Sequence, residues 1–235
     1  MRPLVVVFAF LVGCGPRTPT SIEIDPVLAR QVPADAVAIG GVKLDALRGN
    51  PLFQKWIAGR VDQPTQGVSE VVLASNGKDL VVLTKDKNPP PAGKGGVPAS
   101  LREKMRSIPP HAQVWAVGIG SGAFPAAIPM RGNLANLQKV LKALESWTAY
   151  ADLSAGLKMD GSAVYRSEAD ATEIHDFLKG LVAFGRLTAP DNAPELLKLL
   201  DTVQISRQKN VVRVSADITA DLLDKALAKV VPNQR

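Results

Sequence analysis

Few residues of the kind that carry metal or redox chemistry occur in this chain. Its 235 residues include one cysteine, Cys14, and two histidines, His111 and His175. One cysteine excludes an intrachain disulfide, and zinc sites usually need three or four ligands at a recognisable spacing. We therefore expect no disulfide framework, no metal site and no bound cofactor.

Aromatic residues and long apolar runs are also scarce. Phe, Trp and Tyr make up 5% of a chain that is 46% hydrophobic, so valine, leucine, isoleucine and alanine must fill the core. After residue 13 no apolar run approaches the roughly 18 residues that a membrane-spanning helix needs. The composition, with 21% charged residues, is that of a globular protein. The length suffices for one sizeable domain or two small ones.

The N-terminus contains the most specific pattern in the chain. Arg2 and the amino group of Met1 give a positive start, and residues 4–12 are all apolar. That run is too short to span a bilayer but is typical of a signal peptide. It ends in Leu11-Val12-Gly13-Cys14, which resembles the lipobox of bacterial lipoproteins: an aliphatic residue, a variable position, a small residue and then cysteine. The resemblance covers residues 1–14.

This resemblance implies both a modification and a location. In bacterial lipoproteins the cysteine thiol receives a diacylglycerol and a signal peptidase cuts just before it, which here means cleavage between Gly13 and Cys14. Lipid on Cys14 would hold the chain at a membrane of the cell envelope, facing the periplasm or the exterior. Gly15 stands where some lipoproteins carry an aspartate that retains them at the inner membrane, so the outer membrane is favoured where there is one. The alternative is an ordinary secretory signal with an incidental or buried cysteine.

The rest of the chain indicates an α+β fold with two tandem units. Residues 14–30 contain three prolines and little periodicity, as expected of a tether. The order strand, helix, hairpin, helix then occurs twice, over residues 31–108 and 109–235, and the two units begin similarly at Val32-Pro33 and Ile108-Pro109. This order resembles the ferredoxin-like split βαβ unit, and predicts antiparallel sheets with helices packed on one face.

Local patterns place the elements of the two units. In the first, we expect a strand over 37–43, a helix over 45–58 interrupted at 49–51, a hairpin around Asn76-Gly77, and a short helix that a capping box opens at Ser100 and Pro109 closes. In the second, we expect a strand over 111–119, a helix over 133–147 and a hairpin around Asp160-Gly161. Ser167 and Thr219 should cap helices, with a short helix over 194–200 and a hairpin over 203–217 between them. The helix after Ser167 should bury Ile174, Phe177, Leu178, Leu181 and Val182.

A basic segment coincides with a proline- and glycine-rich loop at 85–99. Residues 78–106 hold seven basic and three acidic side chains, which is four of the chain's net six positive charges. One interpretation is contact with anionic lipid or an acidic partner; the alternative is a solvated loop. No aromatic residues are interleaved with these charges as stacking platforms, so we expect no nucleic acid partner. The candidate contact residues are Lys85, Lys87, Lys94, Arg102, Lys104 and Arg106.

No pattern indicates a catalytic centre. His175 lies in Glu173-Ile174-His175-Asp176, which fits a solvated helix face better than a metal site, and His111 fits a surface turn. Ser121 lies between Gly120 and Gly122, and this run satisfies neither the nucleophile-elbow nor the dinucleotide pattern. The carboxylates expected at turns and helix starts are Asp160, Glu168, Asp170, Asp221 and Asp224, and core packing is expected for Trp56, Trp115 and Trp147.

These observations favour a lipid-anchored envelope protein with a non-enzymatic binding or scaffold role. An envelope hydrolase whose residues meet only in the folded chain is the first alternative. A lipoprotein that binds a small ligand in an apolar cavity between the two units is the second.

Overall fold

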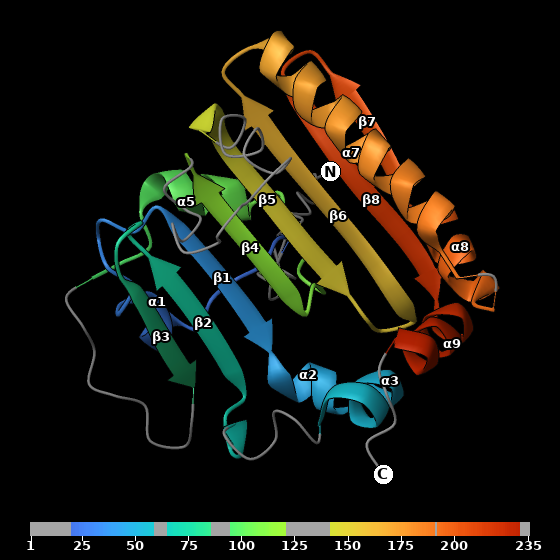
Figure 1. The fold of residues 1–235 in the computed structure, drawn as a ribbon. Coiled ribbons are helices and arrows are strands. Elements are labelled where there is room, and N and C mark those ends of the chain that lie inside the picture. The colour runs from blue at the N-terminus through green and yellow to red at the C-terminus, as the bar shows by residue number, and fades with distance from the viewer. Residues whose placement is uncertain (1–19, 59–64, 86–94, 121–141, 191, 231–235) are drawn as a thin grey trace, which may run out of the picture.

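The strands that the structure describes lie in one sheet (Figure 1). A computed structural model describes residues 20–58, 65–85, 95–120, 142–190 and 192–230. In them eight strands take the order β3-β2-β1-β4-β5-β6-β8-β7, and every neighbouring pair is antiparallel. The strands are β1 (Ala38–Lys43), β2 (Glu70–Ser75), β3 (Leu80–Lys85), β4 (Val114–Ile119), β5 (Leu144–Asp152), β6 (Gly156–Tyr165), β7 (Gln204–Gln208) and β8 (Val211–Thr219).

Helices lie beside both halves of this sheet. The shorter ones are α1 (Pro26–Ala29), α2 (Leu44–Arg48), α3 (Pro51–Phe53), the π-helical turn η1 (Gln54–Ala58), α5 (Ala99–Met105) and α8 (Pro194–Asp201). The longer ones are α7 (Glu168–Thr188) and α9 (Ala220–Val230). None of the described helices is long and apolar enough to cross a bilayer.

The α+β class is confirmed, and so are several local predictions. The β2–β3 hairpin turns at Asn76-Gly77, where Gly77 has a φ of 90° that favours glycine. The Ser167 hydroxyl accepts a hydrogen bond from the Asp170 N–H at 3.1 Å and caps α7. Thr219 Oγ1 accepts from the Leu222 N–H at 3.4 Å, in the first turn of α9. The interrupted helix, the short helix α8 and the β7–β8 hairpin also form as expected.

The sheet buries opposite faces in its two halves. Residues directly opposite each other in neighbouring strands share a face, and the pairs Ile39–Val117, Val117–Thr148, Thr148–Ser162 and Ser162–Arg213 trace face 1 across the sheet. On face 1, strands β3, β2, β1 and β4 are covered by α1, α5 and the residues around Ile22. On face 2, which carries Val212, strands β5, β6, β8 and β7 are covered by α7, α8 and α9 (Figure 1). The expectation of helices on one face is therefore wrong.

The two predicted ferredoxin-like units are not confirmed. Strand β1, from residues 31–108, pairs with β4, from residues 109–235, along five residue pairs, so both segments contribute to one continuous sheet. The predicted order of strand, helix, hairpin and helix is observed over residues 31–108. In residues 109–235 the predicted helix between the first strand and the hairpin is not observed, because residues 133–141 lie outside the described part and Leu144 to Trp147 belong to β5.

Two predicted elements around β5 and β6 are wrong. Leu144 to Trp147 form the start of β5 rather than the end of a helix; residues 133–141 of that prediction lie outside the described residues. Asp160-Gly161 lies in the middle of β6, because Asp160 pairs with Tyr150 on one side and Ser215 on the other. The ladder hydrogen bonds on both sides override the turn preference of an Asp-Gly pair.

The segment before α5 also differs from its prediction. Helix α5 begins at Ala99 with Pro98 at the N-cap position and no side-chain cap, so Ser100 lies inside the first turn. Lys85 is the last residue of β3 rather than part of a loop. The Gly96 N–H donates to the Val32 carbonyl at 3.0 Å, so this end of the predicted loop is attached to the packed body; residues 86–94 lie outside the described part.

Tryptophan and α7 packing match the sequence in part. Trp115 is buried in the face 1 core, Trp147 packs partly buried near Leu144 and Tyr165, and Trp56 donates from Nε1 to Asp224 Oδ1 at 2.7 Å. On α7, Ile174 is buried, but Leu181 is 54% exposed because the last turns of the helix extend past the sheet contacts. Leu181 was expected on the inner face, and that expectation is wrong.

Candidate functional site

A polar hollow lies on face 1, where no described helix covers strands β5, β6 and β8. Its volume is about 410 Å³, and it lies between these strands and the C-terminal end of α5. Tyr150, Thr148, Trp147 and Ser146 come from β5, Asp160, Ser162 and Val164 from β6, and Arg213 from β8, so the apolar side chains Trp147 and Val164 line it together with the polar ones. We call this hollow the sheet groove.

Alternation along the strands explains why these polar residues gather. Successive side chains of a strand point to opposite faces, and face 2 of this half is covered by α7, α8 and α9. The face 2 positions are therefore apolar, as with Ala163, Val212 and Ala216, whereas the intervening face 1 positions carry hydroxyl and charged groups. The polar floor of the groove follows from this asymmetric covering.

The ion pair between Asp160 and Arg213 lies at one end of the groove. Arg213 Nε donates to Asp160 Oδ2 at 2.6 Å, from adjacent strands. The Asp160 side chain is 15% exposed and that of Arg213 is 61% exposed, so a fixed carboxylate holds an accessible guanidinium. The hydrogen bond that Arg213 donates to Asp160, together with the charge of the carboxylate, raises the pKa of Arg213.

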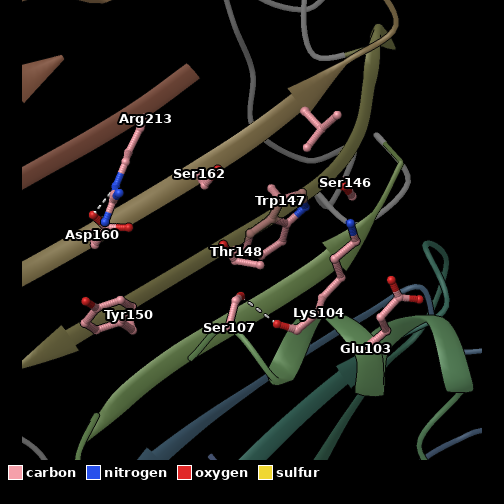
Figure 2. Close-up of a pocket in the computed structure, with 11 residues that line it drawn as sticks. Glu103, Lys104, Ser107, Ser146, Trp147, Thr148, Tyr150, Asp160, Ser162 and Arg213 are labelled. Atoms are coloured by element: carbon pink, nitrogen blue, oxygen red, sulfur yellow. Dashed lines mark hydrogen bonds and ion pairs between the residues drawn. The ribbon is translucent and has the colours of Figure 1, made fainter. Parts of the chain in front are cut away.

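The other end is formed by α5 and the residues after it. Figure 2 shows Glu103 and Lys104 at the end away from Arg213, Asp160 and Tyr150. Ser107 lies between Lys104 and Tyr150 in this view, and its Oγ donates to the Lys104 carbonyl at 2.8 Å. The charged side chains of the groove thus number two acidic and two basic, and they balance.

A second hollow of about 400 Å³ adjoins the groove on the same face. It shares Tyr150, Asp160 and Arg213 with the first hollow, and Gln204, Ser215 and Asp217 also line it. The ion pair therefore lies where the two hollows meet. On face 2, an apolar hollow lies over β4, β5, β6 and β8, all from residues 109–235 and so not between the two predicted units.

The six predicted basic residues are in different surroundings. Lys85 pairs with Asp25 Oδ2 at 2.8 Å, and Arg102 Nη2 donates to the Val97 carbonyl at 2.9 Å. Lys104 lines the sheet groove, and Arg106 is exposed just after α5. Lys87 and Lys94 lie outside the described residues, as do Gly13 and Cys14.

The N-terminal segment enters beside the groove. The Ile22 N–H donates to the Ile108 carbonyl at 2.9 Å, and Ile108 follows Ser107, which lines the groove. Ile22 itself is buried in the face 1 core with Ile108. The first described residues are therefore fixed next to the α5 wall.

Neither histidine belongs to the groove. His111 is exposed before β4, with Nε2 3.6 Å from Asp152 Oδ2, and His175 Nδ1 is 2.8 Å from Asp176 Oδ1 on α7. Burial raises the pKa of Asp152, but hydrogen bonds from Ser154 and Gln113 and the charge of His111 outweigh burial and lower it. Within the described ranges no three His, Cys, Asp or Glu side chains are grouped to hold a metal ion.

The predicted carboxylates do not converge. Glu168 and Asp170 lie in the first turn of α7, Asp221 lies in that of α9, and Asp224 pairs with Lys55 at 2.8 Å. Of these five, Asp160 alone lines the groove.

Tyr150, Thr148, Ser162 and Arg213 were not among the residues predicted from the sequence. A signal was present: Ser146, Thr148 and Tyr150 alternate at every second position, as do Arg213, Ser215 and Asp217. Ser146 fell within the predicted helix over 133–147, and Thr148 and Tyr150 fell in no predicted element, so their shared face was not recognised.

Comparison with known proteins gives no match, since no protein family, no curated protein and no solved structure matches this chain. The function is therefore inferred from the groove and the N-terminal pattern.

Proposed function

We propose that this chain is a lipid-anchored protein of a bacterial cell envelope that binds a ligand, without chemical conversion, in the sheet groove. The observation that carries the proposal is the open polar face of β5, β6 and β8. It presents hydroxyl groups around the Asp160–Arg213 pair, and each of these strands is paired on both sides, so the floor is rigid. No histidine or cysteine lines this groove among the described residues, which favours binding over catalysis.

The N-terminal pattern supports the anchoring part of the proposal. Leu11-Val12-Gly13-Cys14 fits lipid attachment to Cys14, and Ile22 is fixed beside the groove. Ile22 lies eight positions after Cys14, so the two residues can be at most about 28 Å apart when the chain between them is fully extended. Lipid on Cys14 would therefore keep the groove close to the membrane surface.

Metabolic labelling with a fatty-acid analogue tests the anchor. The wild-type protein should incorporate label and be cut before Cys14, whereas Cys14→Ala should remain unlabelled and uncut. Label in the Cys14→Ala protein, or an unmodified thiol in the mature wild type, contradicts the lipoprotein assignment.

A groove-blocking variant tests the binding part. Ser162 lies at the centre of the floor, so Ser162→Trp should fill the groove whatever its ligand is. Lipid on Cys14 would by itself hold the protein on envelope fractions, so this test uses the chain from residue 15 to residue 235, which carries no lipid. In that chain we expect Ser162→Trp to lose at least about tenfold of the retention on native envelope fractions that the unsubstituted groove gives. Lys198→Trp, at an exposed position of α8 beside face 2, is the matched control and should behave as wild type. Equal retention of all three proteins would show that the groove is not the binding surface.

A further inference from the structure

We infer that the ligand of the sheet groove is a neutral glycan chain that spans the two adjoining hollows, with the Asp160–Arg213 pair contacting it at their junction. This inference rests on the proposed function, because it specifies the ligand of the same groove.

The shape of the site indicates an elongated ligand. The two hollows have volumes of about 410 and about 400 Å³ and share Tyr150, Asp160 and Arg213. Each has the size of a site for a small molecule, and their shared wall makes them consecutive along face 1. A ligand with repeating polar units can occupy both, whereas a single small molecule fills one.

The charge of the groove indicates a neutral ligand. In the first hollow Glu103 and Asp160 balance Lys104 and Arg213, and Arg213 Nε lies 2.6 Å from Asp160 Oδ2. In the second hollow Lys158 and Asp217 balance each other as well, with Nζ 3.5 Å from Oδ2. An anionic ligand would have to approach two carboxylates, and a cationic ligand would have to approach two basic groups. An apolar ligand would bury the hydroxyl groups of the floor without hydrogen bonds, which costs free energy.

The available hydrogen-bonding groups match a polyhydroxylated ligand. A sugar hydroxyl both donates and accepts, and the floor offers both roles through Thr148, Ser162 and Ser215. Asp160 can accept from a hydroxyl while Arg213 donates to its neighbour, because Asp160 occupies only the Nε–H of the guanidinium. The Tyr150 ring supplies an aromatic surface for the C–H groups of a sugar.

A peptide ligand is disfavoured by the position of the groove. Peptides often bind sheets by adding a strand at an edge, where backbone N–H and C=O groups are unpaired. Strands β5, β6 and β8 each have two neighbours, so the floor has no free edge. Recognition here must come from side chains on a sheet face.

Calorimetry with the full-length lipoprotein in detergent micelles tests the inference. The probes are chitotetraose and chitobiose as neutral glycans, and heparin as an anionic one. We expect the tetrasaccharide to bind at least about tenfold more tightly than the disaccharide. Its affinity should change less than about twofold between about 50 and about 300 mM NaCl, because no net charge is neutralised. Heparin binding with strong salt dependence, and no binding of neutral glycans, would overturn the inference.

Substitutions in the groove give a charge-specific readout. Tyr150→Ala should weaken tetrasaccharide binding by about tenfold or more. Asp160→Asn should also weaken it, and should create salt-sensitive heparin binding because Arg213 loses its counter-charge. Lys198→Ala should bind as wild type. Thermal unfolding of each variant identifies any that does not fold, and Arg213→Gln supplies a second groove variant, which should lose glycan affinity without gaining heparin affinity.

Two further probes separate the sources of such a glycan. Both probes use the chain from residue 15 to residue 235, because lipid on Cys14 would bind any vesicle. Retention on isolated cell-wall sacculi assigns a wall glycan, and retention on vesicles carrying a neutral glycolipid, but not on glycolipid-free vesicles, assigns a lipid headgroup; either supports the inference. If Ser162→Trp abolishes retention on envelopes while the wild type binds no glycan probe, the groove binds a ligand of another class, and the proposed function stands without this inference.

Discussion

Gly41 packs directly against Trp115 in the face 1 core. The two residues pair across β1 and β4, and a Cβ atom at position 41 would lie 2.5 Å from Trp115 Nε1. Trp115 is buried, and its Nε1 has no hydrogen-bond partner in the described part of the chain. The ring is therefore held by packing against a position that has no side chain.

Gly41→Ala should consequently lower the free energy of unfolding, by about 1–3 kcal/mol, because the indole has to shift in a filled core. Gly180→Ala is the matched control: no atom lies within 4 Å of its added Cβ, and alanine should stabilise α7 by about 0.5–1 kcal/mol. Urea denaturation followed by circular dichroism measures both. Equal stability of Gly41→Ala and wild type would show that the core accommodates the methyl group.

Asp25 links α1 to strand β3. Its carboxylate accepts from the Val27 N–H at 2.8 Å and pairs with Lys85 at 2.8 Å. The hydrogen bond from Lys85 lowers the pKa of Asp25; burial opposes this, and the Val27 N–H and the lysine charge add to the lowering. A carboxyl whose pKa is lower in the folded state stabilises the fold above its unfolded pKa, and this stabilisation is lost as the pH falls through its folded pKa.

We therefore expect the wild type to lose free energy of unfolding below about pH 4, and Asp25→Asn to lose less over the same interval. Asparagine keeps the acceptor for Val27 and removes only the charge, so the cap is preserved. Urea midpoints of both proteins, measured between about pH 5 and about pH 2.5, give the difference, because this interval spans the ordinary pKa of an aspartate. Parallel curves for the two proteins would exclude a contribution from this pair.

Residue environments were predicted best where a local pattern decides them. Ser167 and Thr219 cap helices, and Trp115 is in the core, because capping and burial depend on neighbouring residues and hydrophobicity. Asp160 could not be placed, because its strand is stabilised by partners 53 and 55 residues away, Arg213 and Ser215, rather than by its neighbours.

Helix α7 has two parts with different surroundings. Ile174 is buried against the sheet, whereas the apolar side chains of the last turns are exposed, with Leu187 85% exposed. Phe184 belongs to the exposed part. An apolar side chain of α7 should therefore stabilise the fold only where it is buried against the sheet.

Ile174→Ala should cost about 2–5 kcal/mol, since it leaves a cavity between α7 and β8. Phe184→Ser should change the free energy of unfolding by less than about 0.5 kcal/mol. Guanidinium denaturation of both variants measures the contrast. A large loss for Phe184→Ser would indicate that this part of α7 is buried in solution.

Elements were predicted reliably where one periodicity dominated. The β2–β3 and β7–β8 hairpins and the helices α7, α8 and α9 follow from turn residues, caps and apolar spacing. The start of β5 was mistaken for a helix because Leu144 fits the apolar stripe extrapolated from residues 134–141, while its alternating burial shows only in the folded sheet. A short apolar stretch is compatible with both the helical period of about 3.6 residues and the strand period of about 2 residues.

In the described chain, residues 31–108 and 109–235 are connected by a strand ladder, a shared core and side-chain hydrogen bonds. The β1–β4 ladder joins them along five residue pairs, and Leu101 and Met105 belong to the same buried core as Trp115 and Val117. In the helices after β1, Asn50 Nδ2 donates to the Leu153 carbonyl, and Trp56 Nε1 and Lys55 Nζ reach Asp224 on α9 at 2.7 and 2.8 Å. The two segments therefore share both a sheet and a core.

Unfolding should accordingly be a single cooperative transition. Tryptophan fluorescence, which reports on Trp56, Trp115 and Trp147, and far-ultraviolet circular dichroism should give the same urea midpoint. Two separated midpoints would show that the segments unfold as independent domains.

The α+β class and the element order of residues 31–108 could be predicted from the sequence, but the single sheet and the groove could not. Pairing between strands that are far apart in the chain produces no pattern in the local sequence. The groove also depends on which face of each half of the sheet the helices cover. That choice is made by α5 and α7 together, not by any one segment.

The entry of the chain next to the α5 wall has a consequence for how tightly the groove must bind. With lipid on Cys14, the short segment between Cys14 and Ile22 would keep the groove close to the bilayer. Any ligand attached to the same membrane is then present at a high effective concentration. A weak intrinsic affinity would then suffice for occupancy. Lengthening this segment would lower the effective concentration of the ligand at the groove and leave every contact in the groove unchanged.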